Sequence, residues 1–160
     1  ENAPLKLTLI TNPMCGFCKE SHTIVERILQ QESAEIQITI RFNVRVDDRE
    51  AIGTKIAAKI LELYHTTTEK ECLQALSDIY GDVNAETWLS KWGETFNEDY
   101  FTILKNEKEW CTANKINFTP AILLNGKQYP TAYNIKDLLF FLDDLIEEQT
   151  IAKEELIEIE

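Results

Sequence analysis

Residues 11–22 read TNPMCGFCKESH and contain two of the four cysteines of this chain, Cys15 and Cys18. The preceding run, LKLTLI at residues 5–10, alternates apolar and polar positions and predicts a short strand. Apolar residues at helical spacing continue to Gln31, so the cysteine pair opens a helix of about four turns. A pair in this position suits three roles: a metal site, a structural disulfide or a redox-active dithiol.

Composition excludes several classes of protein. The chain has 160 residues, 44% of them hydrophobic, which suffices for a buried core in one domain. Its formal net charge of −12 disfavours binding to phosphate backbones, so we expect no nucleic-acid partner. No apolar run reaches the roughly 18 residues that cross a bilayer, which predicts a soluble chain. The chain begins at Glu1 rather than methionine, as a processed protein or a piece of a longer one does.

Residues 36–46, IQITIRFNVRV, alternate strictly and predict a strand near the edge of a sheet. With the preceding strand and helix, this strand predicts a right-handed parallel β-α-β unit. Residues from about 48 to 115 then change to helical periodicity, and Gly81 and Gly93 lie where two helices are expected to end. The first apolar stripe of this helical segment consists of Ile56, Ile60, Leu63 and Tyr64.

The last part of the chain predicts a hairpin followed by a helix. Asn125-Gly126 separates the strand AILL from KQYP, which indicates a two-residue type I′ turn. An amphipathic helix follows over residues 135–146, with Asn134 as its expected N-cap. We therefore expect one domain over residues 1–148, with the helical insert at about 48–115, and an acidic tail over residues 149–160.

This element order resembles the α/β thioredoxin-like fold, with a helical insertion between the βαβ half and the ββα half as in DsbA-like proteins. Three segments, residues 11–22, 109–130 (EWCTANKINFTPAILLNGKQYP) and 133–142 (YNIKDLLFFL), resemble a more specific group. That group is the C-terminal thioredoxin-like domain of bacterial vitamin K epoxide reductase (VKOR) family proteins, Bacteroidetes type.

The position of the cysteine pair assigns a role to each sulfur. The unpaired N–H groups of a helix N-terminus stabilise an anion, so Cys15 is the expected nucleophile and Cys18, one turn later, the resolving thiol. Gly16 and Phe17 between them add no charge, so we expect Cys15 to be less acidic than the extreme pKa near ~3.5 of strongly oxidising relatives. Thioredoxins commonly carry a buried aspartate six residues before the first cysteine, where this chain has Leu9.

The resemblance also implies a substrate site. It predicts a cis peptide bond between Thr119 and Pro120, facing the cysteine pair. The backbone of Thr119 would then lie beside Cys15, where an extended substrate segment could pair with it. We therefore expect Gly16, Phe17, Thr119 and Pro120 to bind substrate.

Two other roles for the pair remain open. Cys15, Cys18 and His22 have spacing that could supply three zinc ligands, although a structural site needs a fourth, and His22 is expected to be a solvated helix residue. A structural disulfide is the second alternative, but it would close too short a loop to stabilise much.

Other chemically distinctive side chains are expected to be structural. Cys72 and Cys111 lie on apolar helix stripes, which predicts buried, unpaired thiols, with a disulfide between them as the alternative. Trp88, Trp92 and Trp110 are expected to be core or groove aromatics.

The leading hypothesis is a thiol–disulfide oxidoreductase that acts on cysteine-containing proteins without metal or organic cofactor. The resemblance implies an extracytoplasmic, periplasmic location, possible attachment to a membrane portion, and a quinone-coupled VKOR-like membrane partner that reoxidises the dithiol. The net direction would then be disulfide donation, with a disulfide reductase or isomerase as the alternative. The rival from another class is a non-catalytic protein-interaction domain.

Overall fold

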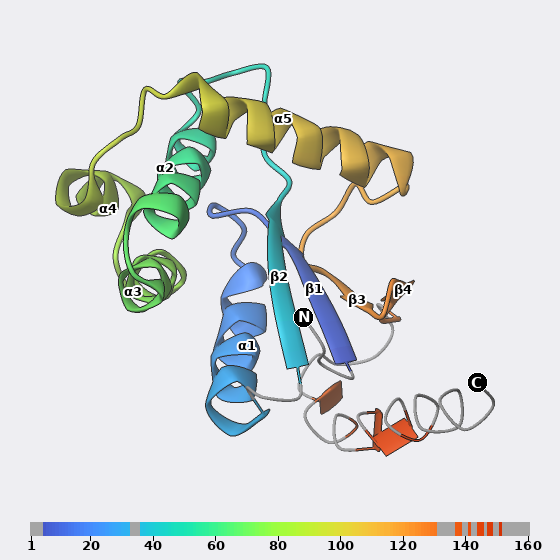
Figure 1. The fold of residues 1–160 in the computed structure, drawn as a ribbon. Helices are drawn as coiled ribbons and strands as arrows, with labels where there is room; N and C mark the ends of the chain where they lie inside the picture. Colours follow the sequence, from blue (N-terminus) through green and yellow to red (C-terminus); the bar gives the residue numbers. More distant parts are fainter. Residues whose placement is uncertain are drawn as a thin grey trace. The chain divides into compact units, whose positions relative to one another are not determined.

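The computed structural model describes residues 5–32 and 36–130, together with residues 137–138, 141, 144–145, 147–148 and 151. The described chain confirms the predicted element order, with a run of helices between the second and third strands (Figure 1). The predicted last helix, its N-cap Asn134 and the acidic tail fall largely outside the described residues. The elements are β1 (Leu5–Thr11), α1 (Cys18–Glu32), β2 (Ile36–Phe42), α2 (Ile52–Thr66), α3 (Glu69–Tyr80), α4 (Ala85–Trp92), α5 (Glu98–Ala113), β3 (Ala121–Leu124) and β4 (Lys127–Gln128).

The described residues divide into two compact units. The sheet unit takes its residues from 1–9, 20–40 and 121–160, and the helical unit takes its residues from 10–19 and 41–120. Both cysteines of the Cys-x-x-Cys pair, together with Thr119 and Pro120, belong to the helical unit. No helix in the described part of the chain combines the length and apolarity that crossing a membrane requires.

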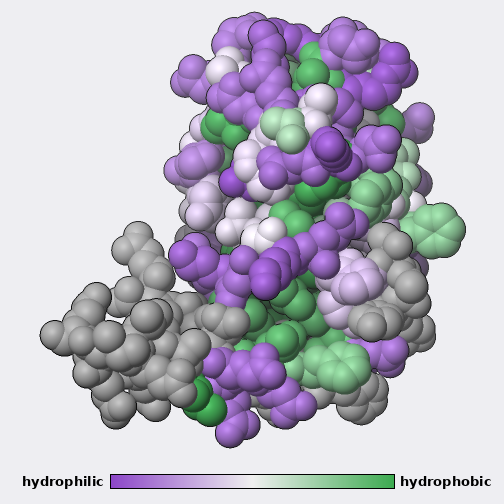
Figure 2. Space-filling view, turned by 90° about the vertical axis from the view of Figure 1, so that its right-hand side faces the viewer, coloured by the Kyte–Doolittle hydropathy of each residue, from purple (hydrophilic) through white to green (hydrophobic). Residues whose placement is uncertain are grey.

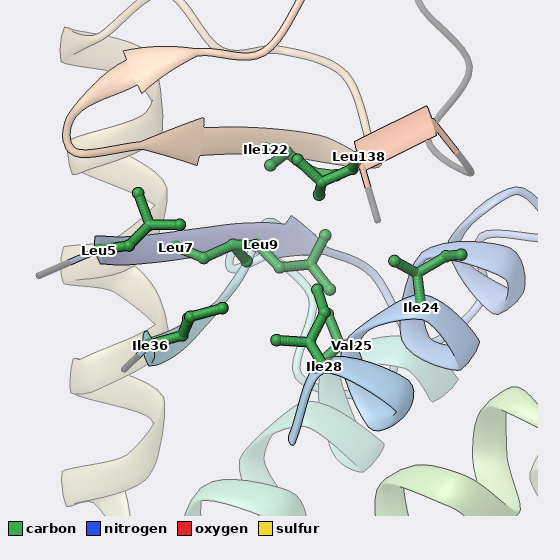
Figure 3. Packing of buried hydrophobic residues seen from close by; sticks show 9 residues of the cluster. All are labelled: Leu5, Leu7, Leu9, Ile24, Val25, Ile28, Ile36, Ile122 and Leu138. Atoms are coloured by element: carbon green, nitrogen blue, oxygen red, sulfur yellow. The ribbon is translucent and has the colours of Figure 1, made fainter. Parts of the chain in front are cut away.

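The sheet has the strand order β2-β1-β3-β4, which confirms that the alternating strand β2 lies at an edge. The core of the sheet unit forms where alternate residues of β1 meet one face of α1 (Figure 3). Period-two alternation on the strand and a spacing of three to four residues on the helix place these side chains toward one another. The buried cluster consists of Leu5, Leu7, Leu9, Ile24, Val25, Ile28, Ile36, Ile122 and Leu138.

The hairpin between β3 and β4 confirms the turn predicted from Asn125-Gly126. Both central residues have positive φ, 49° at Asn125 and 83° at Gly126, as a type I′ turn requires. The antiparallel register pairs Leu124 with Lys127. The Asn125 side chain also accepts a hydrogen bond from the Lys6 backbone N–H at 2.7 Å.

Strand β2 ends at Phe42, so the prediction of a strand through residue 46 is wrong for the last four positions. The Asn43 N–H still donates to the Thr11 carbonyl at 2.9 Å, but side chains also bond to the backbone near this end of the strand. The Phe42 N–H donates to the Glu107 carboxylate at 2.9 Å, and the Thr54 hydroxyl donates to the Arg45 carbonyl at 2.8 Å. The alternating sequence alone does not reveal these partners, because they come from α5 and α2.

Within the helical unit, α2 packs against α3, α4 and α5 (Figure 1). Side chains of Thr68, Asn84 and Asn97 cap α3, α4 and α5 by accepting backbone N–H bonds. Gly81 and Gly93 are the C-caps of α3 and α4, as predicted, and Gly93 uses a positive φ of 87°.

Aromatic residues of this unit divide between core and surface. Trp88 is fully buried, and its indole N–H donates to the Ala75 carbonyl at 2.9 Å. Tyr64 was expected on the buried stripe of α2, but it is 67% exposed, because the buried face of α2 passes through Ile60 and Leu63 and leaves Tyr64 at its margin.

Figure 2 shows a face where hydrophilic residues predominate and hydrophobic residues appear between them.

Candidate active site

The loop that carries Cys15 is held by one side chain that sequence reasoning did not single out. The Asn12 side-chain carbonyl accepts from the Met14 N–H at 2.9 Å, which forms an Asx turn, and its amide donates to the Asn43 carbonyl at 3.2 Å. The Cys15 N–H donates to the Asn12 carbonyl at 3.0 Å. Asn12-Pro13 was the available turn signal for this arrangement.

Gly53 in the first turn of α2 lies close to the same loop. A Cβ built on Gly53 would lie 3.1 Å from Met14 Cγ and 3.3 Å from Asn12 Oδ1. A side chain at this position would press on the loop, so the glycine permits the close approach of α2.

The two thiols differ in exposure, as predicted. Cys18 opens α1 and is 0% exposed, whereas Cys15 precedes the helix and is partly exposed. Burial opposes ionisation of Cys15, but hydrogen bonds from Cys18, from the Thr119 side chain and from the backbone N–H groups of Cys18 and Phe17 outweigh it and lower the pKa of Cys15. Burial, followed by the proximity of Cys15, raises the pKa of Cys18 to about 11. Cys15 is thus the more accessible and more acidic sulfur.

The structure also brings Thr119 to this site. The Cys15 Sγ donates to the Thr119 carbonyl at 3.6 Å, across 104 residues of sequence. The peptide bond between Thr119 and Pro120 is cis. The backbone of Thr119 therefore lies beside Cys15, as expected.

Apolar side chains around Cys15 are exposed. Phe17 is 84% exposed and Met14 is 53% exposed. Gly16, between the cysteines, has open space where a Cβ would lie. The surface next to the accessible sulfur is therefore apolar and unobstructed at these positions.

A buried hydroxyl pair lies behind Cys18, and sequence reasoning missed it. Thr11 Oγ1 and the Tyr80 hydroxyl are 2.8 Å apart. The Thr11 hydroxyl and the Asn12 N–H both hydrogen-bond to the Cys18 sulfur. In the sequence, Tyr80 ends an apolar stripe with Cys72, Leu76 and Ile79, and it lies 69 residues from Thr11.

His22 is 4% exposed, so the expectation of a solvated helix residue is wrong. It follows Cys18 by four positions and therefore shares the inward side of α1 with the buried Val25. Burial lowers the pKa of His22 to about 3, which keeps the imidazole neutral. Within the described ranges, no three side chains of the His, Cys, Asp or Glu type converge as metal ligands.

Cys72 and Cys111 are buried, which confirms the prediction for both side chains. All four cysteines are free thiols in this structure. Burial raises the pKa of Cys72 and of Cys111, which makes both sulfurs poor nucleophiles.

The order of alkylation tests the asymmetry of the pair. When the reduced protein is treated with limiting iodoacetamide at pH 7, we expect Cys15 to react about 100-fold faster than Cys18, because its thiolate is more populated and more accessible. Peptide mapping by mass spectrometry gives the order. The rate at Cys15 should inflect below the pH of an ordinary thiol, and faster labelling of Cys18 would reverse the assignment of roles.

Comparisons with known proteins agree with the fold. A family model described as thioredoxin matches residues 1–144. No curated protein matches the sequence significantly. Similar solved structures include Proteus mirabilis ScsC in a transitional conformation, with a TM-score of 0.74, 17% identity and coverage of 92% of this chain and 70% of that chain. A periplasmic thioredoxin-like protein from Salmonella enterica serovar Typhimurium has a TM-score of 0.71, 16% identity and coverage of 93% and 86%.

Reduced DsbA1 from Neisseria meningitidis is also similar, with a TM-score of 0.62, 15% identity and coverage of 94% of this chain and 89% of that chain. These likenesses confirm the α/β thioredoxin-like fold with a helical insertion. The resemblance to VKOR-family domains stays a prediction.

Proposed function

Since this chain belongs to the thioredoxin family, as a thiol–disulfide oxidoreductase with a Cys-x-x-Cys pair, we propose that it donates the Cys15–Cys18 disulfide to cysteine-containing proteins. The observation that supports the proposed direction is the set of hydrogen bonds around Cys15 Sγ, from Cys18, Thr119 and the backbone N–H groups of Cys18 and Phe17, which lowers the pKa of Cys15. A stabilised thiolate stabilises the reduced enzyme, and an enzyme with a stable reduced form gives its disulfide away readily.

The reaction proceeds in two exchanges. A substrate thiolate attacks Cys15 Sγ, the Cys15–Cys18 bond breaks, and Cys18 leaves as a thiolate that takes up a proton. A second substrate thiolate then attacks the substrate sulfur of the mixed disulfide and releases Cys15 as a thiolate. Two electrons pass from the substrate dithiol to the enzyme disulfide, so the substrate is oxidised and the enzyme is reduced.

Substrate binding is assigned to the residues around Cys15. The Thr119 carbonyl lies 3.6 Å from Cys15 Sγ, close enough for a backbone paired with Thr119 to present its cysteine to this sulfur. Pro120 has no amide hydrogen and cannot donate to that pairing. Phe17, with its exposed ring, offers an apolar contact, and Gly16 leaves the approach unobstructed.

Reoxidation requires an external oxidant, which we propose to be a quinone-coupled, VKOR-like membrane protein, in the same chain or separate. The support is the resemblance of residues 11–22, 109–130 and 133–142 to VKOR-family thioredoxin-like domains. The same resemblance supports an extracytoplasmic location, and one protein of similar fold is described as periplasmic. We retain residues 1–148 as the proposed catalytic domain and residues 149–160 as its tail.

The equilibrium of the dithiol with glutathione tests the direction. We expect a reduction potential above the value of about −270 mV typical of thioredoxin and below about −120 mV, the value of a strong oxidant. The measurement separates oxidised from reduced protein by alkylation and mass spectrometry across a series of glutathione ratios. A value near that of thioredoxin would overturn disulfide donation and favour the reductase or isomerase. Cys72→Ala, which changes a buried thiol elsewhere, should leave the value unchanged.

A further inference from the structure

A chain of buried hydroxyls ends at the resolving sulfur. Thr11 and Cys18 are 0% exposed and Tyr80 is nearly so. The Tyr80 hydroxyl lies 2.8 Å from Thr11 Oγ1, and the Thr11 hydroxyl hydrogen-bonds to Cys18. Three elements supply this chain: the end of β1, the start of α1 and the last residue of α3.

Burial makes Cys18 a poor leaving group as well as a poor nucleophile. A sulfur removed from water loses its hydration, so its thiolate needs hydrogen-bond donors from the protein. The Asn12 N–H supplies one donor and the Thr11 hydroxyl can supply another. Without them, each exchange that frees Cys18 as an anion becomes slower.

Tyr80 is placed to orient the Thr11 hydroxyl, since the two oxygens lie 2.8 Å apart. Burial, followed by the nearby Cys18 and Cys15 thiols, raises the pKa of Tyr80, so its phenol keeps its proton and remains a donor. When the Tyr80 hydroxyl donates to Thr11 Oγ1, the hydrogen of Thr11 is free to point at Cys18. Two hydrogen bonds in series then favour the thiolate of Cys18.

We propose that Thr11 and Tyr80 are positioning residues that stabilise the Cys18 thiolate in disulfide exchange. The inference rests on the proposed oxidoreductase function and extends it to the second sulfur. In reoxidation by a disulfide such as glutathione disulfide, Cys15 attacks first and forms a mixed disulfide with release of one glutathione thiolate. Cys18 then loses its proton to solvent, attacks Cys15 Sγ and releases the second glutathione thiolate. The hydroxyl chain acts on this second step.

No other group near Cys18 takes the place of the two hydroxyls. In the described part of the protein, Cys15 and Tyr80 are the titratable groups that have a charge interaction with Cys18. His22, one turn further along α1, is buried and neutral. The Lys19 ammonium donates a hydrogen bond to the Gly81 carbonyl at 3.3 Å. The position of the buried thioredoxin aspartate holds the apolar Leu9.

Tyr80→Phe and Thr11→Val remove one hydroxyl each and nearly preserve shape. The reduced proteins are mixed with glutathione disulfide, quenched with acid at intervals and analysed by mass spectrometry, which resolves formation of the mixed disulfide from its resolution. We expect resolution to slow about tenfold in both variants, while formation changes less than twofold. The pH midpoint of the resolution step should rise in both, and Thr11→Ser should retain the wild-type values.

Tyr64→Phe is the matched control, since it removes an exposed hydroxyl of the same unit and should match the wild type. Wild-type resolution rates and midpoints in Tyr80→Phe and Thr11→Val would overturn the inference. Equal slowing of both steps without a shift of the midpoint would also overturn it, because it indicates a merely structural effect. If Tyr80→Phe does not fold, the comparison of Thr11→Val with Thr11→Ser decides the question. Failure of the wild type to form any mixed disulfide would instead contradict the oxidoreductase function itself.

Discussion

Cys15→Ser is expected to lower the rate of disulfide exchange by at least about 1,000-fold. A serine hydroxyl stays protonated near pH 7 and cannot form the mixed disulfide, whereas Cys15 is partly exposed and has a lowered pKa. The assay follows oxidation of a reduced two-cysteine peptide by the oxidised protein, with insulin reduction as the reverse reaction. The loss should appear in both directions because both pass through Cys15.

Cys18→Ser is the matched comparison for this loss. It retains the nucleophile and removes the resolving thiol, so we expect it to accumulate the mixed disulfide with a disulfide substrate rather than to remain inert. Cys72→Ala should turn over at the wild-type rate, since this buried thiol hydrogen-bonds to the Ile60 carbonyl outside the site. Equal activity in the wild type and Cys15→Ser would leave the non-catalytic interaction domain as the better hypothesis.

Glu107→Gln is expected to remove a pH-dependent loss of stability of about 3 kcal/mol. Burial raises the pKa of Glu107 from 4.5 to about 7, partly offset by the Phe42 N–H and by Arg41. Below pH 4.5 the carboxyl is protonated in both the folded and the unfolded state, so stability is fully present. Between 4.5 and about 7 only the unfolded state releases the proton, and stability therefore falls as pH rises.

Urea unfolding from pH 4.5 to 8 checks this difference. The free energy of unfolding of Glu107→Gln, relative to wild type, should rise across this interval and level off above about pH 7.5. Glutamine can still accept the Phe42 hydrogen bond, which now spans 2.9 Å, so the variant is expected to fold. Glu109→Gln, an exposed carboxylate on the same helix, should show no such trend. A constant difference between Glu107→Gln and wild type would contradict a buried, protonated Glu107.

Several features followed from the sequence because they are local. The Cys15–Cys18 spacing at a helix start, the positive-φ turn at Asn125-Gly126 and the glycine C-caps each depend on a few adjacent residues. The difference in exposure between Cys15 and Cys18 also followed from the sequence, because Cys15 precedes the helix and Cys18 lies in its first turn. Neighbours distant in the chain have little influence on these features.

The tertiary structure alone decided the partners of the buried polar groups. Thr11 meets Tyr80 across 69 residues, and Phe42 meets Glu107 across 65. No periodicity encodes such pairs, because an amphipathic stripe predicts only that a side chain faces inward and does not predict which group it meets. His22 and Tyr64 were misplaced for a related reason. A residue at the margin of a helical stripe is buried or exposed according to the element packed against it. The sequence by itself therefore determined the redox pair and the fold class. Tertiary packing determined the burial and the hydrogen-bond partners that set the chemistry of the two cysteines.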